Sequence, residues 1–247
     1  MSDGSTDHSN EIQLLTLAEP YECSYLPDEL ANSVFLGKGF NPSWGQYSGL
    51  SRIGFRRSGD HYYRPNCPNC NACMSCRIIC NEIELNKKSF KRLTNKAKDF
   101  IVSIEKPMFS TTQYDIYEKY INSRHANGDM YPATIEQYKN FLLVQNDFSR
   151  LFTIKTAEGR LISSTAIDIL DDGISAIYTY FDPEFQELSP GTLAVLLLCK
   201  HAIDQGLPYI YLGYWVKNSS KMSYKKRFQP LELFKNDTWE PMTKADM

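Results

Sequence analysis

The sequence contains no long apolar run, and we expect no secretory leader at its start. None of its 247 residues falls in a stretch approaching the ~18 apolar residues of a membrane-spanning helix. The opening MSDGSTDHSNE lacks the apolar core of a signal peptide. We therefore expect a cytoplasmic protein without a membrane partner, in which residues 1–12 form a disordered arm. In a reducing compartment, its seven cysteines are expected to be thiols or metal ligands rather than disulfides.

The sequence also lacks a strong excess of charge of either sign. With 27 basic and 29 acidic residues the net charge is −2, so the chain as a whole favours no DNA partner. Two segments differ from this average, because residues 87–98 (KKSFKRLTNKAK) and 217–227 (KNSSKMSYKKR) carry basic residues and no acid. Each alone is typical of a solvated face, but together they predict a local patch that binds phosphates.

Cysteines are concentrated in one place. The stretch CPNCNACMSCRIIC (residues 67–80) has the spacing C-x2-C-x2-C-x2-C-x3-C, which looks like a ferredoxin cluster loop. The last cysteine is followed by Asn81 rather than Pro, and no second run exists to hold a second cluster. The ferredoxin interpretation is therefore weak. A metal site and plainly buried thiols both remain open.

Two compositional regimes predict an α+β protein. Residues 13–100 are rich in Gly, Pro, Cys and aromatics and predict a small N-terminal Cys/Gly-rich module. Residues 101–240 predict two helices, a hairpin and a third strand, an apolar helix over SPGTLAVLLLCKHAIDQG, and a central strand over PYIYLGYWV. This order matches a GNAT-like acyltransferase domain with a mixed sheet, followed by a tail at 241–247. Its turn ELSPGTLA has one Gly and a Pro, which argues against acetyl-CoA as the donor.

Several motifs resemble one family. They are GFRRSGDHYYRPNC, RHANGDM, YTYFDP with SPGT after it, and YLGYW followed by KMSYK. In this order they resemble the arginyl-tRNA–protein transferases, whose bacterial branch is the aspartate/glutamate leucyltransferases, over residues 21–239. The resemblance implies transfer of leucine from leucyl-tRNA to the N-terminal α-amine of proteins that begin with Asp or Glu. It also implies that the product is marked for N-end rule degradation.

The resemblance gives the cysteines a context. The eukaryotic arginyltransferases of this family place a CxxC pair near the N-terminus and further cysteines after the YRP motif, where they ligate a metal or an iron–sulfur cluster. By this comparison the candidate ligands are Cys23, Cys67, Cys70 and Cys73, although Leu26 replaces the second early cysteine. No cofactor is required for the chemistry. A structural zinc or Fe–S cluster and an ordinary set of thiols are both compatible with this cysteine sequence.

Aminoacyl transfer needs positioning more than covalent catalysis, because the ester is already activated. Recognition of an acidic N-terminal residue requires a cation, for which Arg56 and Arg57, with Ser58 beside them, are the candidates. At least one of these arginines is expected to pair with Asp60 or a neighbouring loop instead.

Further candidates come from the regular half of the chain. Asp182, Tyr178 and Tyr214 are the candidate catalytic residues, because they lie on or after the two strands where this fold places reacting groups. His125 could act as a base, although such a histidine is more often a helix-capping residue. The basic segments supply the candidate tRNA contacts, which are Lys91, Arg92, Lys221, Lys225 and Lys226.

Three alternatives remain at this point. An acetyl-CoA-dependent acetyltransferase would use the same fold without tRNA. A non-enzymatic zinc module that binds RNA would explain the cysteines and the basic segments, but not the regular second half. An arginyl-tRNA–protein transferase would keep the family and change the donor.

Overall fold

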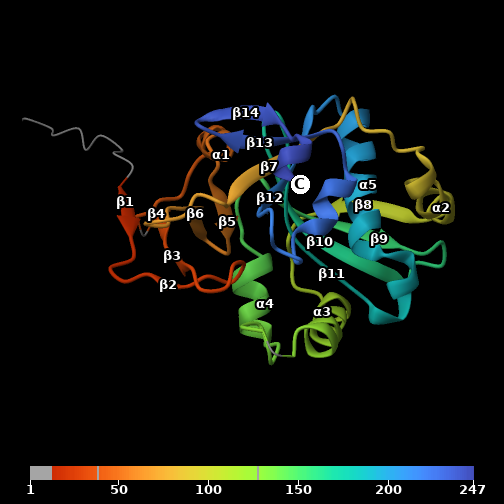
Figure 1. Cartoon of the computed structure of the whole chain (residues 1–247). Coiled ribbons are helices and arrows are strands. Elements are labelled where there is room, and N and C mark those ends of the chain that lie inside the picture. Colours follow the sequence, from red (N-terminus) through yellow and green to blue (C-terminus); the bar gives the residue numbers. More distant parts are fainter. Residues whose placement is uncertain (1–12, 38, 127) are drawn as a thin grey trace, which may run out of the picture.

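The computed structural model describes residues 13–37, 39–126 and 128–247, so the arm expected at 1–12 lies outside the described residues. Its centre is an eight-stranded sheet in the order β14-β13-β7-β12-β11-β10-β9-β8 (Figure 1). The strands are β7 (Met74–Ile79), β8 (Ile101–Glu105), β9 (Ser149–Lys155), β10 (Leu161–Ile169), β11 (Gly173–Phe181), β12 (Tyr209–Trp215), β13 (Leu231–Lys235) and β14 (Thr238–Pro241).

One pair of neighbouring strands is parallel. β11 runs parallel to β12, and helix α5 (Pro190–Asp204) connects them, whereas the other neighbours are antiparallel. The predicted hairpin is confirmed as β9 and β10, and the predicted apolar helix as α5. The chain is thus a mixed α/β protein with a large mixed sheet, as the sequence predicts for residues 101–240.

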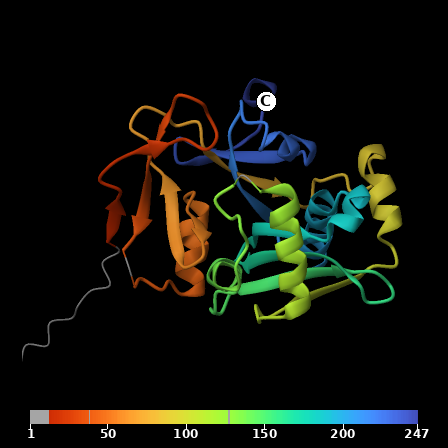
Figure 2. The ribbon, with the colours of Figure 1, turned by 90° about the horizontal axis from the view of Figure 1, so that it is seen from below.

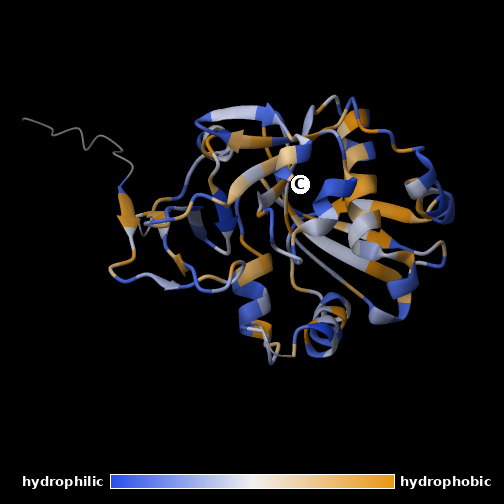
Figure 3. Cartoon of the chain, viewed as in Figure 1, coloured by the Kyte–Doolittle hydropathy of each residue, from blue (hydrophilic) through white to orange (hydrophobic). Residues whose placement is uncertain are grey.

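Helices cover both faces of this sheet. α5 and α2 (Lys88–Lys96) share an apolar core with Phe152 and Ile154 of β9, whereas α3 (Thr111–Arg124) and α4 (Ile135–Leu142) pack on Leu151. Successive strand residues point to opposite faces, which is why neighbours in β9 belong to different cores. Figure 2 shows α3 and α4 in front of the sheet, and Figure 3 shows α5 as largely hydrophobic where α3 is largely hydrophilic.

A second, smaller sheet lies beside the large one. It has the order β1-β4-β6-β5, with strands β1 (Leu14–Thr16), β4 (Ser33–Leu36), β5 (Arg56–Ser58) and β6 (His61–Pro65). β2 (Tyr21–Glu22) pairs with β3 (Leu30–Ala31). Helix α1 (Trp44–Arg52) begins with a capping box between Ser43 and Gln46. The ring of its Tyr47 stacks on that of Phe148, which immediately precedes β9, with 4.7 Å between the ring centres.

The expected N-terminal Cys/Gly-rich module is not confirmed as a separate unit. β7 belongs to residues 13–100 but lies between β13 and β12 of the large sheet. The predicted tail is also packed. The short helix η3 (Lys244–Asp246) accepts a hydrogen bond from Trp215 Nε1 at the carbonyl of Asp246, over 2.9 Å. The domain boundaries given above otherwise stay a prediction.

Candidate active site

The two parallel strands separate part-way along their length. β11 and β12 pair at Gly173–Ser175 with Tyr209–Tyr211 and make no further pairing, although both continue for several residues. β12 also has a bulge, where Gly213 has a φ of +76° that favours glycine. The ammonium group of Lys225 donates a hydrogen bond to the carbonyl oxygen of Tyr214, which the bulge leaves available. The bulge therefore has its own buried hydrogen-bond donor.

A cavity of about 750 Å³ opens where these strands separate, and we call it the splay cavity. Ala176 and Ile177 of β11, Leu212 of β12 and Val195 of α5 form its apolar part. Aromatic side chains from three elements stand around this part: Tyr120, Tyr178 and Tyr224. Such a combination suits an apolar side chain together with a flat ring.

The start of α5 forms one wall of the splay cavity. Ser189 adopts a left-handed conformation with a φ of 47°, and Pro190 occupies the first turn of the helix. Gly191 and Thr192 follow and also line the cavity. The first backbone N–H groups of a helix lack intrahelical partners and favour anions. Because Pro190 has no N–H, this wall offers few free donors and is suited to a single developing oxyanion rather than to the pyrophosphate of coenzyme A.

The side chains around the splay cavity are positively charged or neutral. Arg124 and Lys221 line it, and among the described lining residues none is acidic. The Lys221 ammonium donates to the carbonyl of Ser24 at 3.1 Å, which connects this cavity to the loop between β2 and β3. Partial burial, followed by the charges of Arg124 and Lys221, lowers the pKa of His125 below 6.5. His125 is therefore neutral at pH 7.

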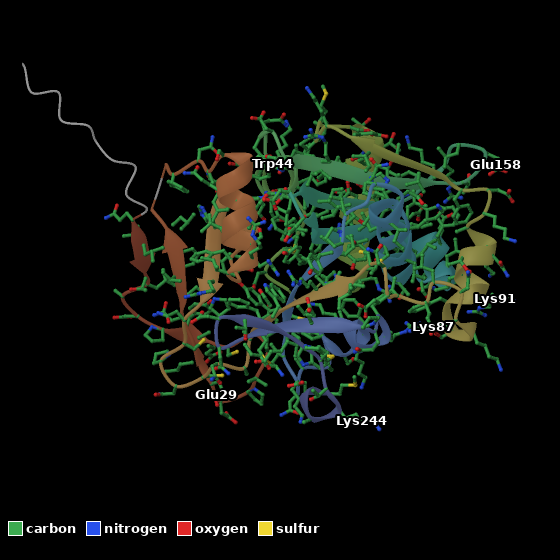
Figure 4. The ribbon with its side chains drawn as sticks, turned by 90° about the horizontal axis from the view of Figure 1, so that it is seen from above. Glu29, Trp44, Lys87, Lys91, Glu158 and Lys244 are labelled. Carbon is green, nitrogen blue, oxygen red and sulfur yellow. The ribbon has the colours of Figure 1, made fainter. Side chains whose placement is uncertain are left out.

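The two basic segments of the sequence meet beside this cavity. Lys87 donates to the carbonyl of Arg227 at 2.7 Å, and Arg227 Nη1 lies 3.4 Å from the Thr192 hydroxyl. Phe90 of α2 stacks on Phe228 at 5.6 Å, which holds the segments together. Figure 4 shows Lys91 on α2, and Lys87 just before this helix, at the end of the molecule away from the small sheet. An exposed cationic surface therefore runs from α2 to the start of α5.

Arg57 is committed to a buried ion pair. Its Nε and Nη2 donate to the two carboxylate oxygens of Asp168 at 2.8 and 2.7 Å, and Nη2 also reaches the Ser149 hydroxyl at 3.1 Å. The side chains of Arg57 and Asp168 are 1% and 0% exposed. Its remaining Nη1 donates to the carbonyl of Gly59. The predicted ion pair of one arginine is thus present, but its partner is Asp168 and not Asp60.

Arg56 is buried in a different way. It is 4% exposed, and its Nη1 donates to the carbonyls of Phe55 and Ser51 at 2.9 and 3.4 Å. Within residues 13–37, 39–126 and 128–247, its Nε and Nη2 have no hydrogen-bond partner and it forms no ion pair. Its guanidinium carbon lies 5.1 Å from the centre of the Tyr211 ring. Arg56 is therefore a buried cation with free donors.

A second cavity of about 470 Å³ lies between the two sheets, and we call it the inter-sheet cavity. Ser58, His61 and Tyr63 line it from β5 and β6, and Tyr214 and Asp129 line it from the other side. Because paired residues of neighbouring strands point to the same face, Arg56, which pairs with Tyr63, faces this side of the small sheet. Arg56 therefore lies on the face of the small sheet that borders the inter-sheet cavity, although it is not one of the residues that line it.

The four candidate metal ligands surround one further cavity. It is lined by Cys23, Cys67, Cys70 and Cys73. Burial, followed by the charges of the other three thiols, raises the pKa of Cys73 to about 12. In the described part of the chain, however, no group of His, Cys, Asp or Glu is arranged to hold a metal ion. Cys76 and Cys80, in contrast, are fully buried in the large core.

Comparison with known proteins identifies the family of this chain. The family model "Arginine-tRNA-protein transferase, C terminus" matches residues 112–235, and the corresponding N-terminus model matches residues 21–92. The chain belongs to the arginine-tRNA-protein transferase family. It is therefore an aminoacyltransferase, which confirms the prediction from the motifs.

Curated relatives span most of the same length. Proteins named aspartate/glutamate leucyltransferase from Pseudomonas fluorescens and Stutzerimonas stutzeri are 42% and 43% identical over 221 residues, which is 90% of this chain and 93% of each relative. The one from Marinobacter nauticus is 42% identical over 224 residues, 91% of this chain and 94% of the relative. Among solved structures, FemX aligns with a TM-score of 0.51 at 10% identity, over 90% of this chain and 86% of FemX, and so shares the fold.

Two predicted site residues of this transferase have structural roles. Asp182 caps the short helix η1 (Pro183–Leu188) by accepting from Glu184 N at 3.1 Å, and it pairs with Arg160 at 2.9 Å. It does not line the splay cavity. Lys225 is 4% exposed, so its buried ammonium is not available to a phosphate backbone. The prediction of a tRNA contact by Lys225 is therefore wrong, whereas Lys91, Arg92, Lys221 and Lys226 are exposed.

Other site residues lie where contact with a substrate is feasible. Tyr178 lines the splay cavity, and Ser58 lines the inter-sheet cavity. Tyr214 lines the inter-sheet cavity too, with its hydroxyl donating to the carbonyls of Gly54 and Tyr63 at 3.0 and 3.3 Å. The sequence interpretation missed Arg124, although it ends a predicted helix inside the RHANGDM motif. Tyr120 and Tyr224 were missed as well, because their periodicity resembles that of ordinary core residues.

Proposed function

We propose that this chain transfers leucine from leucyl-tRNA to the N-terminal α-amine of proteins that begin with Asp or Glu. In the reaction the α-nitrogen attacks the ester carbonyl, an amide bond forms, and the ester bond to the tRNA 3′-terminal oxygen breaks. The product then carries an N-terminal leucine and enters the N-end rule pathway in the cytoplasm. The names of the curated relatives support this assignment.

The splay cavity is the observation that carries the proposal. Its apolar part fits a leucyl side chain, its tyrosines fit the terminal adenine, and the start of α5 fits the carbonyl oxygen of the ester. A volume of about 750 Å³ falls within the usual range of about 300–1,000 Å³ for sites that enclose one small ligand. The exposed cations from α2 to Lys221 extend outward from this site, where the tRNA acceptor end would lie.

The charge of the splay cavity favours leucine over arginine as the donor. An arginyl side chain would bring a guanidinium group beside Arg124 and Lys221, and no described lining residue supplies a carboxylate to pair with it. Burying a cation without a partner is costly, whereas an aliphatic side chain gains from the apolar surface. Leucine therefore suits this cavity and arginine does not.

We propose that Arg56 selects the acidic acceptor residue. Arg57 already pairs with Asp168, so the free donors of Arg56 are the ones available to a substrate carboxylate. Ser58 and Tyr63 lie on the same side of the small sheet, at the inter-sheet cavity. The acceptor N-terminus would enter the inter-sheet cavity and meet the donor near Lys221. The contact of Lys221 with Ser24 lies between the two cavities, because Lys221 lines the splay cavity and Ser24 lines the inter-sheet cavity.

We also propose a structural metal or Fe–S cluster at Cys23, Cys67, Cys70 and Cys73. The four thiols line one cavity, and all-thiolate sets are typical of structural zinc. Because the described residues are not arranged as a ligand set, the four thiols would draw together when the metal binds. The group would brace the small sheet beside β7 and take no part in the transfer. Metal content per chain tests this part of the proposal independently of activity.

A donor comparison tests the assignment. The full chain would be given an Asp-terminated peptide with leucyl-tRNA, arginyl-tRNA or acetyl-CoA in separate reactions, and initial rates would be compared. We expect transfer from leucyl-tRNA and at least tenfold slower transfer from the other two donors. Equal or faster transfer from arginyl-tRNA would overturn the choice of leucine, and acetylation would overturn the aminoacyl-tRNA donor.

A further inference from the structure

Aminoacyl transfer releases a proton that the enzyme must accept. An N-terminal α-amine has a pKa of about 7.7–8.0, so most of it is an ammonium ion at pH 7 and cannot attack an ester. Of its protons, one must leave before attack and another must leave as the amide forms. The departing 3′-oxygen of the tRNA takes up one proton, which leaves one net proton per turnover. A base near the ester would therefore accelerate the step.

The splay cavity contains few groups able to accept this proton. Arg124 and Lys221 are cations, and no described residue that lines the cavity is a carboxylate. Burial raises the pKa values of the three lining tyrosines, Tyr120, Tyr178 and Tyr224, so that they stay protonated. The remaining polar side chains are hydroxyls and an amide, which are not bases at pH 7. His125 is the one basic, uncharged side chain left among the described lining residues.

The backbone holds His125 at the rim of the cavity. It is the C-terminal cap of α3, its N–H donates to the carbonyl of Ile121 at 2.8 Å, and its own carbonyl accepts from Gly128 N at 2.8 Å. Its ring lies 5.1 Å from that of Tyr120, centre to centre. The imidazole forms no hydrogen bond or ion pair within the described residues. It is therefore positioned and has a nitrogen available.

The charges around His125 favour its neutral form. Burial is the larger cause, and the cations Arg124 from α3 and Lys221 from the segment before η2 (Ser223–Arg227) add to it. Tyr120, Tyr178 and Tyr224 face the same cavity and carry no charge at pH 7. The free-base form of His125 therefore predominates at pH 7, and the same two cations favour loss of the proton from the resulting imidazolium to solvent at the rim.

We propose that His125 is the general base that takes the proton from the acceptor's α-ammonium group. This inference rests on the proposed function, because it assigns a role within that reaction. His125 accepts the proton at a ring nitrogen, the freed amine attacks the leucyl carbonyl, and the tRNA 3′-oxygen leaves with a proton.

His125→Ala tests this role, with His201→Ala as the matched control. His201 is a partly buried imidazole on α5 whose pKa is also lowered, and it lines neither the splay nor the inter-sheet cavity. Transfer of leucine to an Asp-terminated peptide would be measured from pH 5.5 to 9 for both variants and for the unaltered chain. Leucyl-tRNA binding and thermal melting would be measured in parallel.

We expect His125→Ala to lower the rate at pH 7 by about 10²- to 10⁴-fold, with unchanged leucyl-tRNA affinity and melting. The deficit should narrow towards pH 9, where the amine loses its proton to solvent, and added imidazole should restore part of the rate. A normal rate at pH 7, or an equal deficit at every pH without imidazole rescue, would overturn the role. If the unaltered chain itself transfers no leucine, the proposed function has failed instead, and this inference with it.

Discussion

Replacement of Arg57 should lower the stability of the protein rather than change its choice of acceptor. Among the described residues, Arg57→Ala leaves the fully buried Asp168 carboxylate with the Ser149 hydroxyl, at 2.6 Å, as its remaining side-chain hydrogen-bond partner. Breaking a buried ion pair in this way costs about 3–5 kcal/mol. In a chain of this size each kcal/mol lowers the melting temperature by about 2–4 °C, so the expected decrease is about 6–20 °C.

A double variant checks the cause of this loss. Arg57→Met combined with Asp168→Leu removes both charges and fills the space with apolar groups, so it should recover most of the stability lost in Arg57→Ala. Melting followed by circular dichroism is the assay. If Arg57→Ala melts within about 2 °C of the unaltered chain, which corresponds to under about 1 kcal/mol, the ion pair is not the structural element described here.

The neighbouring Arg56→Ala should affect transfer to acidic acceptors more than it affects stability. It leaves no carboxylate unpaired, so its melting temperature should fall less than that of Arg57→Ala. If Arg56 binds the acceptor carboxylate, kcat/KM for Asp-terminated peptides should fall by the equivalent of about 1.5–3 kcal/mol, or about 10- to 150-fold. Leucyl-tRNA affinity should not change. Normal transfer rates to Asp- and Glu-terminated peptides in a folded Arg56→Ala would refute the reasoning.

Three further outcomes are expected. The double variant Lys221→Glu/Lys226→Glu should bind tRNA more weakly, and its slope of log affinity against log salt should fall by about 0.7–0.9 per lost phosphate contact. The control Lys244→Glu, on η3, should change neither the affinity nor the slope. An unchanged slope in the double variant would exclude the phosphate role. Anaerobically prepared protein should contain about one zinc ion or cluster per chain, and Cys70→Ala should lose it; absence of both zinc and iron would reduce these cysteines to packing. Burial opposes ionisation of Asp246, but hydrogen bonds from Lys235 and Thr243 outweigh it and lower its pKa from 3.8 to about 2. The stability that this carboxylate contributes is therefore present above pH 4 and lost as the pH falls towards 2, and Asp246→Asn should flatten acid unfolding in that window.

Regular elements could be predicted from the sequence because their signals are local. The hairpin of β9 and β10 and the apolar helix α5 follow from periodicity within about 20 residues, and both are confirmed. The cysteine stretch was harder to interpret because β7 begins at Met74 and divides it. Cys73 and the cysteines before it lie in loops, whereas Cys76 lies inside the large sheet.

The site residues depended on contacts that the sequence does not display. Arg57 meets Asp168 at a separation of 111 residues, so nothing near the GFRRSGD motif distinguishes Arg57 from Arg56. Lys221 and Lys225 are four apart, a spacing that would place both on one face of an α-helix. The segment instead forms the 3₁₀ helix η2, which starts at Ser223 and turns Lys225 into the core.

The proposed function is tested most directly by the amino acid that the protein attaches to each acceptor peptide. An equimolar mixture of peptides beginning with Asp, Glu, Lys and Arg, incubated with the protein and a pool of fully charged tRNA, would be read by mass spectrometry. The account predicts that Asp and Glu peptides each gain one leucine and that Lys and Arg peptides gain nothing. Products that carry arginine, or leucine on the Lys and Arg peptides, would contradict it.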